Sequence, residues 1–127
     1  MSRSENFSLF AIVDGDDVGN KVESRILAND VTGFVSTSEM ISAAMERTAD
    51  RAARVPGVMV ISTGGDSILL QLDDDSVAEL VDVLEALQRP GYITFSVGVG
   101  GTLQQSFIAL RMAKSSGKCK IVIHPDC

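Results

Sequence analysis

The chain has 127 residues, which is enough for one domain and too few for two full hydrophobic cores. Hydrophobic residues make up 45% and charged residues 22% of the sequence, so a disordered chain is excluded, and no apolar run reaches the roughly 20 residues of a membrane-spanning helix. The net charge of -6 argues against a protein that binds duplex DNA, because such proteins neutralise phosphates with an excess of basic residues.

The ends of the sequence and its cysteines give no sign of secretion. Residues 1–6 are polar and contain no apolar segment, so we expect no signal peptide and a cytoplasmic protein without membrane insertion. Cys119 and Cys127 form no CxxC pair, so we expect neither a disulfide framework nor a zinc site. We therefore expect a single domain over residues 1–127, with its core in about residues 7–123.

The first part of the sequence predicts one strand and two helices. Residues 7–13 are an apolar run of strand length, rich in β-formers, that stops at an aspartate. Residues 18–28 place apolar side chains on one face of a helix. A second helix is predicted to begin at Ser36, because Ser36 and Glu39 have the spacing of a capping box, and to stop before Pro56.

The middle of the sequence predicts a hairpin followed by a helix. Residues 58–62 and 67–72 are two strand-like runs joined through Gly64 and Gly65, so we expect them to pair antiparallel. A third helix is predicted over residues 76–87, where a second capping box precedes an apolar pattern of helical spacing.

The last part of the sequence completes the predicted domain. Residues 92–99 form a strand, residues 102–115 a helix opened by a third capping box, and residues 118–123 a final strand. Where a helix joins two strands, parallel neighbours are favoured. The order β-α-α-β-β-α-β-α-β predicts an α+β domain of the ferredoxin-like, polymerase-palm (nucleotidyl cyclase-like) kind.

Acidic residues follow the first strand and lie in the hairpin. In a palm-type sheet the first strand lies beside the hairpin, so we expect Asp14, Asp16 and Asp66 to converge. Crowded carboxylates repel one another unless a cation neutralises them, and hard oxygen ligands select Mg²⁺ or Mn²⁺. Two such ions sharing carboxylates commonly support nucleotidyl transfer, so we predict a two-metal site of that kind.

Glycines and lysines near these carboxylates favour the same chemistry. Gly15 leaves its carbonyl accessible to a metal ion, and the Gly64–Gly65 pair lets a base or ribose approach the backbone. Gly19 and Asn20 open a helix whose free N–H groups would bind a triphosphate. The lysines predicted to hold phosphates lie at a helix-to-strand turn and are Lys114 and Lys118.

These motifs resemble those of the nucleotidyl-cyclase and polymerase-palm superfamily over about residues 7–123. Residues 64–67 (GGDS) are similar to the GGDEF signature of diguanylate cyclases and to the Gly-Gly-Asp-Asp motif of CRISPR polymerase palm domains. Residues 14–20 (DGDDVGN) are nearer to the CRISPR polymerases. A free-standing palm of this length most resembles the minimal CRISPR polymerase (mCpol) family.

The resemblance implies a role for each matching residue. Asp14 and Asp66 would be metal ligands together with the Gly15 carbonyl, and Asp16 would be a further acidic group of the catalytic and metal-binding site. Lys114 and Lys118 would hold phosphates. The residues implied to line the triphosphate loop are Asp17, Val18, Gly19 and Asn20.

The resemblance also implies an activity and a setting. The family is expected to make cyclic oligonucleotide signals in prokaryotic anti-phage defence, beside a separate effector that binds the signal. ATP is the favoured substrate, with Asn29, Asp30 and Ser36 as candidate base-reading residues. A cyclic dinucleotide needs two phosphodiester bonds and one small domain holds one triphosphate, so we predict a C₂ homodimer with opposed active-site faces.

One position departs from both related motifs. Where they have a fourth acidic residue, this chain has Ser67, which can hydrogen-bond but is not a strong metal ligand. A palm that binds nucleotides without catalysis is therefore a second interpretation, and a single-nucleotide cyclase is a third. A phosphoacceptor receiver domain is disfavoured, because no helix separates residues 58–62 from residues 67–72.

Overall fold

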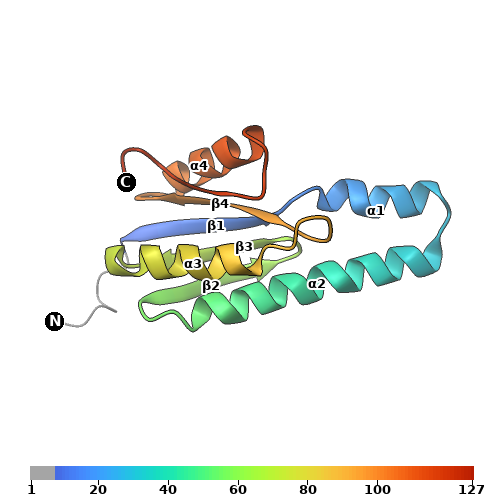
Figure 1. The fold of residues 1–127 in the computed structure, drawn as a ribbon, viewed down its shortest axis with the longest axis horizontal. Coiled ribbons are helices and arrows are strands. Elements are labelled where there is room, and N and C mark those ends of the chain that lie inside the picture. The colour runs from blue at the N-terminus through green and yellow to red at the C-terminus, as the bar shows by residue number, and fades with distance from the viewer. Residues whose placement is uncertain (1–7) are drawn as a thin grey trace.

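The computed structural model describes residues 8–127, which form a five-stranded sheet with helices on both faces (Figure 1). The strands are β1 (Leu9–Gly15), β2 (Val58–Gly64), β3 (Ser67–Leu72), β4 (Phe95–Gly100) and β5 (Ile121–Ile123). The helices are α1 (Val18–Leu27), α2 (Val31–Ala53), α3 (Val77–Leu87) and α4 (Leu103–Ser115), with a 3-10 turn η2 (Asp74–Ser76) before α3. The predicted α+β fold class is confirmed. The predictions for residues 1–6 and for Phe7 lie outside the described residues.

The sheet has the strand order β2-β3-β1-β4-β5. β1 is antiparallel to both of its neighbours, β2 and β3 form the predicted antiparallel hairpin, and β4 and β5 are parallel. Each helical connection joins two strands that run in the same direction, but only β4 and β5 are adjacent. In the other two connections one strand lies between the parallel pair, which is the split arrangement of a ferredoxin-like fold.

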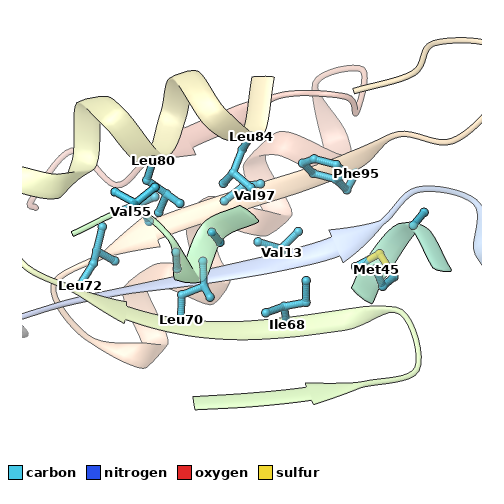
Figure 2. Close-up of a cluster of buried hydrophobic side chains, with 14 of the residues drawn as sticks. Val13, Met45, Val55, Ile68, Leu70, Leu72, Leu80, Leu84, Phe95 and Val97 are labelled. Carbon is cyan, nitrogen blue, oxygen red and sulfur yellow. The ribbon is translucent and has the colours of Figure 1, made fainter. Parts of the chain in front are cut away.

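The main hydrophobic core lies between the sheet and helices α2 and α3 (Figure 2). Alternate side chains of the strands point into it, as the two-residue period of a strand requires. From the helices, Leu80 and Leu84 of α3 and Met45 of α2 meet these strand residues. The buried strand residues are Leu9, Ala11, Val13, Ile68, Leu70, Leu72, Val97 and Val99. Burying each large aliphatic side chain stabilises the fold by about 1.5–3 kcal/mol.

Helix α4 covers the opposite face of the sheet over β4 and β1 (Figure 1). It lies so close to β4 that a Cβ atom on Gly98 would overlap the backbone of Ser106 and Leu110. The Ser106 hydroxyl donates a hydrogen bond of 2.7 Å to the Gly98 carbonyl. This close contact fixes the height of α4 above the sheet and thereby positions Lys114, one turn after Leu110.

Two of the predicted helix caps are wrong. Helix α2 begins at Val31, five residues before the predicted start at Ser36, because Asp30 Oδ1 accepts a hydrogen bond of 2.8 Å from the Gly33 N–H. At α3 the Ser76 hydroxyl instead donates to Asp73 at 2.7 Å.

The Thr102 cap of α4 is confirmed, since Thr102 Oγ1 accepts a 3.0 Å hydrogen bond from the Gln105 N–H. Within residues 8–127, no helix is both long enough and apolar enough to span a bilayer.

Candidate active site at the end of strand β1

Strand β1 and the β2–β3 hairpin bring Asp14 and Asp66 to neighbouring positions. Asp14 lies opposite Ser67 in the β1–β3 register, and the Ser67 hydroxyl donates a 2.6 Å hydrogen bond to Asp14 Oδ1. The Gly15 N–H donates to the Asp66 carbonyl at 2.8 Å. Gly65 turns the hairpin with a φ of 58°, a conformation that suits glycine. The predicted approach of the first strand to the hairpin is therefore confirmed.

Asp16 differs from Asp14 because its carboxylate is buried, with 2% of the residue exposed. Its Oδ1 accepts hydrogen bonds from Lys114 at 2.8 Å and from Ser96 at 2.7 Å. Its Oδ2 accepts from the Thr94 hydroxyl at 2.7 Å and the Cys119 N–H at 2.9 Å. Burial raises the pKa of Asp16, but these hydrogen bonds, led by the one from Lys114, outweigh burial and hold the pKa below its usual value.

The Lys114 ammonium lies among the oxygens that the sequence predicts as metal ligands. Its Nζ is 3.0 Å from Asp14 Oδ2 and 2.8 Å from Asp16 Oδ1, and it donates to the Gly15 carbonyl at 2.9 Å. Burial lowers the pKa of Lys114, whereas hydrogen bonds to Asp16 and Asp14 raise it and prevail. Lys114 is therefore charged at neutral pH and neutralises the carboxylates around it.

The donor set at this edge fits a hard cation. Asp14 and Asp66 supply carboxylate oxygens and Gly15 a backbone carbonyl, the ligand types that Mg²⁺ and Mn²⁺ prefer. Among residues 8–127, no three His, Cys, Asp or Glu side chains are grouped as ligands of one ion. Asp14 and Asp66 therefore occupy neighbouring backbone positions at this edge, whereas both carboxylate oxygens of Asp16 are bonded to protein donors.

The predicted triphosphate loop forms the start of helix α1. No side chain caps this helix, and its N-cap residue, Asp17, has a left-handed backbone with φ of 57°. Gly19 and Asn20 are exposed in the first turn, so the N–H groups there are accessible to an anion. Lys118 forms an ion pair with Asp17 Oδ1 and holds the pKa of Asp17 below its usual value.

The α4–β5 connection brings a backbone amide to the site. Lys118 and Cys119 both have left-handed backbones, with φ of 62° and 50°, a conformation that costs about 1–2 kcal/mol in a residue other than glycine. It delays β5 to Ile121, three residues after the predicted start, and directs the Cys119 N–H to Asp16. Sequence reasoning missed this contact because a backbone amide leaves no signature in the residue type.

Two hollows open beside the acidic edge, one on each face of the sheet. The first, of about 660 Å³, lies between α2 and the hairpin and is lined by Glu46, Asp50 and the Gly64–Gly65 turn. The second, of about 600 Å³, lies under α4 and is lined by Asp14, Lys114, Phe107 and Arg111. Ser67 lines both hollows.

Sequence reasoning also missed the helix residues that line these hollows. Glu46 and Asp50 are four residues apart, as are Phe107 and Arg111, so each pair lies on one helix face. This spacing is the signal that points to a shared surface.

The candidate base-reading residues lie elsewhere. Asn29 and Asp30 follow α1, whose ten residues extend about 15 Å from the acidic edge, and they line a separate hollow. Asp30 caps α2 and pairs with Arg25 at 3.1 Å, and Ser36 is exposed on α2. The connection between α1 and α2, which contains Asn29 and Asp30, lies at the far end of α1 from strand β1 (Figure 1).

A sheet of this order, with an acidic strand end beside a Gly-Gly-Asp hairpin, defines a palm domain of the nucleotidyl-cyclase type. Residues 10–124 match the minimal CRISPR polymerase (mCpol) domain family, and the chain belongs to that family. No curated protein sequence matches the chain.

Several solved structures share the fold. A diguanylate cyclase/phosphodiesterase from Caldicellulosiruptor saccharolyticus matches 94% of this chain and 77% of its own, with 15% identity and a TM-score of 0.67. The GGDEF domain of DgcB from Caulobacter crescentus, solved with c-di-GMP, matches 91% and 77%, with 14% identity and a TM-score of 0.63. A Csm1–Csm4 cassette in complex with cA4 matches 91% of this chain and 20% of its own, with 19% identity and a TM-score of 0.62.

Proposed function

We propose that the chain is a metal-dependent nucleotidyltransferase that joins nucleoside triphosphates, with ATP favoured, into a cyclic dinucleotide and releases pyrophosphate. The observation that carries this proposal is the edge at the end of β1, where Lys114 contacts Asp14 and the Gly15 carbonyl and the hairpin brings the backbone of Asp66 beside Gly15. Membership of the mCpol family supports it, as does a fold shared with structures solved with c-di-GMP and cA4.

The proposed metal ligands are Asp14, Asp66 and the Gly15 carbonyl, which would hold Mg²⁺ or Mn²⁺, with two ions as the expected number. When bound, such ions polarise a phosphoryl oxygen and favour deprotonation of an attacking hydroxyl. We assign Asp16 the positioning of Lys114, because both of its carboxylate oxygens accept hydrogen bonds from the protein. Lys114 places a fixed positive charge where negative charge develops on the transferring phosphate.

The first turn of α1 and Lys118 are proposed to hold the triphosphate. The uncapped N–H groups of residues 18–20 point out of the helix start, where anions bind favourably. Lys118 is paired with the exposed Asp17, and a phosphate can replace that carboxylate with little loss, because exposed ion pairs contribute little.

A homodimer and an effector complete the proposal. Ring closure requires that the second triphosphate also be activated at an acidic edge. We therefore propose a homodimer in which the acidic edges of the two protomers face each other. The product would act on a separate signal-binding effector in prokaryotic anti-phage defence, in the cytoplasm.

A second candidate function is a nucleotide-binding module without turnover. Ser67 favours it, because this hydroxyl, donating to Asp14 Oδ1 at 2.6 Å, stands where the related motifs carry a further carboxylate. Turnover separates the two functions, since both would bind triphosphates.

Mass spectrometry of reaction products tests the proposal. The protein is incubated with Mg²⁺ or Mn²⁺ and each of the four nucleoside triphosphates, singly and mixed. Asp66→Asn, which keeps the side-chain shape and removes the charge, is the matched control. A cyclic dinucleotide that is lost in this variant supports the proposal, and a cyclic mononucleotide would indicate a single-nucleotide cyclase. Bound triphosphate without any product would favour the binding module.

A further inference from the structure

Helix α1 and the start of α2 form an arm, residues 18–36, that projects beyond the ends of the strands (Figure 1). Helix α1 has no buried residue, and the first buried side chain of α2 is that of Ile41. A helix of ten residues is not stable in water by itself, so α1 depends on tertiary contacts. Val18 and Val22 make such contacts beside the core, at the base of the arm only.

The far end of the arm carries a cluster of exposed apolar side chains. Their exposed fractions run from 37% for Phe34 to 87% for Leu27. A hollow of about 320 Å³, lined in part by Val31 and Phe34, opens among them and can receive a side chain of another molecule. Exposed apolar clusters of this kind mark surfaces that bind proteins or membranes. The cluster, called the arm tip below, consists of Ile26, Leu27, Val31, Phe34 and Val35.

The charge of the arm favours a protein over a membrane. Residues 18–36 contain two basic residues, Lys21 and Arg25, and two acidic residues, Glu23 and Asp30, so the net charge of -6 is carried by the rest of the chain. Helices that lie on membranes carry an excess of lysine and arginine, which this arm lacks. A neutral apolar surface can approach an acidic protein without repulsion between like charges, so a second copy of this acidic chain is a suitable partner.

The position of the arm places it beside that second copy. Helix α1 begins at Val18, two residues after Asp16, and its ten residues extend about 15 Å from the acidic edge. A protomer that faces this edge therefore also lies beside the arm, and two-fold symmetry places its own arm in the same way. Because the carboxylates of two facing edges repel each other, the attraction that holds the protomers together has to come from other surfaces.

We propose that the arm tip packs against the body of a second copy of the chain and holds the two protomers together with their acidic edges facing. This inference rests on the homodimer of the proposed function and assigns a contact surface to it. Each protomer supplies one tip and receives the other, so a substitution in the tip acts twice in each dimer.

Sedimentation velocity over a series of protein concentrations tests this contact, with Mg²⁺ and a non-hydrolysable ATP analogue present. Leu27→Glu and Val31→Glu each place a charge in the tip, and these residues are 87% and 73% exposed, so neither substitution should unfold the protomer. Met112→Glu is the matched control, because Met112 is an apolar residue that is 43% exposed on α4, outside the arm. Thermal melting verifies that all three variants are folded.

We expect each tip variant to raise the dissociation constant of the dimer by about tenfold or more, because a carboxylate would have to be buried in an apolar contact. Met112→Glu should dimerise as the wild type does. Formation of cyclic dinucleotide should fall in the tip variants at low protein concentration and recover at high concentration, where mass action restores the dimer.

Tip variants that dimerise as strongly as the wild type would overturn the inference, as would an equal loss in Met112→Glu or a wild type that stays monomeric. The first of these results, with cyclic dinucleotide still formed, would leave the proposed function in place and assign the arm tip to a different partner. A wild type that dimerises through the tip and makes no product would support the contact and contradict the proposed reaction.

Discussion

The Lys114 ammonium lies 2.8 Å from Oδ1 of the buried Asp16, although 98 residues separate the two in sequence. This contact ties the end of α4 to the end of β1. It also accounts for a buried carboxylate beside Asp14, because the ammonium cancels charge that would otherwise force the two carboxylates apart. The Asp16–Lys114 pair therefore links α4 to the end of β1 and also reduces the negative charge at this edge.

Removing one partner of this pair is expected to destabilise the fold strongly. Asp16→Asn keeps the shape of the side chain but leaves Lys114 with less compensating charge, and breaking a buried ion pair in this way costs about 3–5 kcal/mol. Urea unfolding followed by circular dichroism measures the loss. Asp17→Asn is the control, because the Asp17–Lys118 pair is exposed and its removal should change stability little. Similar losses in both variants would contradict the role assigned to Asp16.

Stability should also depend on pH through the same pair. The pKa of Asp16 is lower in the folded chain than the unfolded value of about 3.9, so its contribution is present above that pH and is lost as the pH falls through the folded pKa. The pKa of Lys114 is raised, so its contribution is present below the unfolded value of about 10.4 and is lost as the pH rises through the folded pKa.

Melting temperatures measured from acid to alkaline pH test these signs. The wild type should show a plateau between the two limits, and Asp16→Asn should lose less stability on the acid side than the wild type does. Parallel acid-side curves for the two proteins would show that other carboxylates cause the acid loss.

The close approach of α4 to β4 predicts that replacing Gly98 even by alanine lowers the stability of the fold. Gly98→Ala places a Cβ against the backbone of Ser106 and Leu110, so α4 must move away from the sheet, and overpacking of this kind costs about 1–3 kcal/mol or more. The matched control is Gly19→Ala, because a methyl group added to Gly19 in α1 would have no atom within 4 Å, and this variant should gain up to about 1 kcal/mol. Chemical denaturation of both variants measures the difference, and an unchanged Gly98→Ala would contradict it.

The sequence predicted the fold well because hydrophobic alternation and turn residues are local signals. The acidic strand end and the Gly-Gly-Asp hairpin were found for the same reason, and their adjacency followed from the topology. The start of α2 was missed because Asp30 could be either a helix breaker or a cap, and only the Gly33 contact decides between them. The burial of Asp16 was missed because it depends on donors from three separate segments, Thr94–Ser96, Lys114 and Cys119.

The contact between Ser67 and Asp14 lets us predict how the end of β1 responds to a divalent cation. Its hydroxyl is 2.6 Å from Asp14 Oδ1, so Ser67→Asp would place two carboxylates in contact, and they repel one another until a cation binds between them. We expect Ser67→Asp to melt below the wild type in chelator and to gain more than the wild type when Mg²⁺ is added, because a ligand bound only by the folded state raises its stability.

The control for that response is Ser67→Ala, which removes the hydrogen bond to Asp14 without adding charge. Its stability should fall by about 1 kcal/mol, and its gain on adding Mg²⁺ should not exceed that of the wild type. Differential scanning calorimetry with and without Mg²⁺ compares the three proteins. If Ser67→Asp gains no more from Mg²⁺ than Ser67→Ala does, then Asp14 and position 67 do not face a shared cation, and the metal site proposed at this edge would have to exclude Asp14.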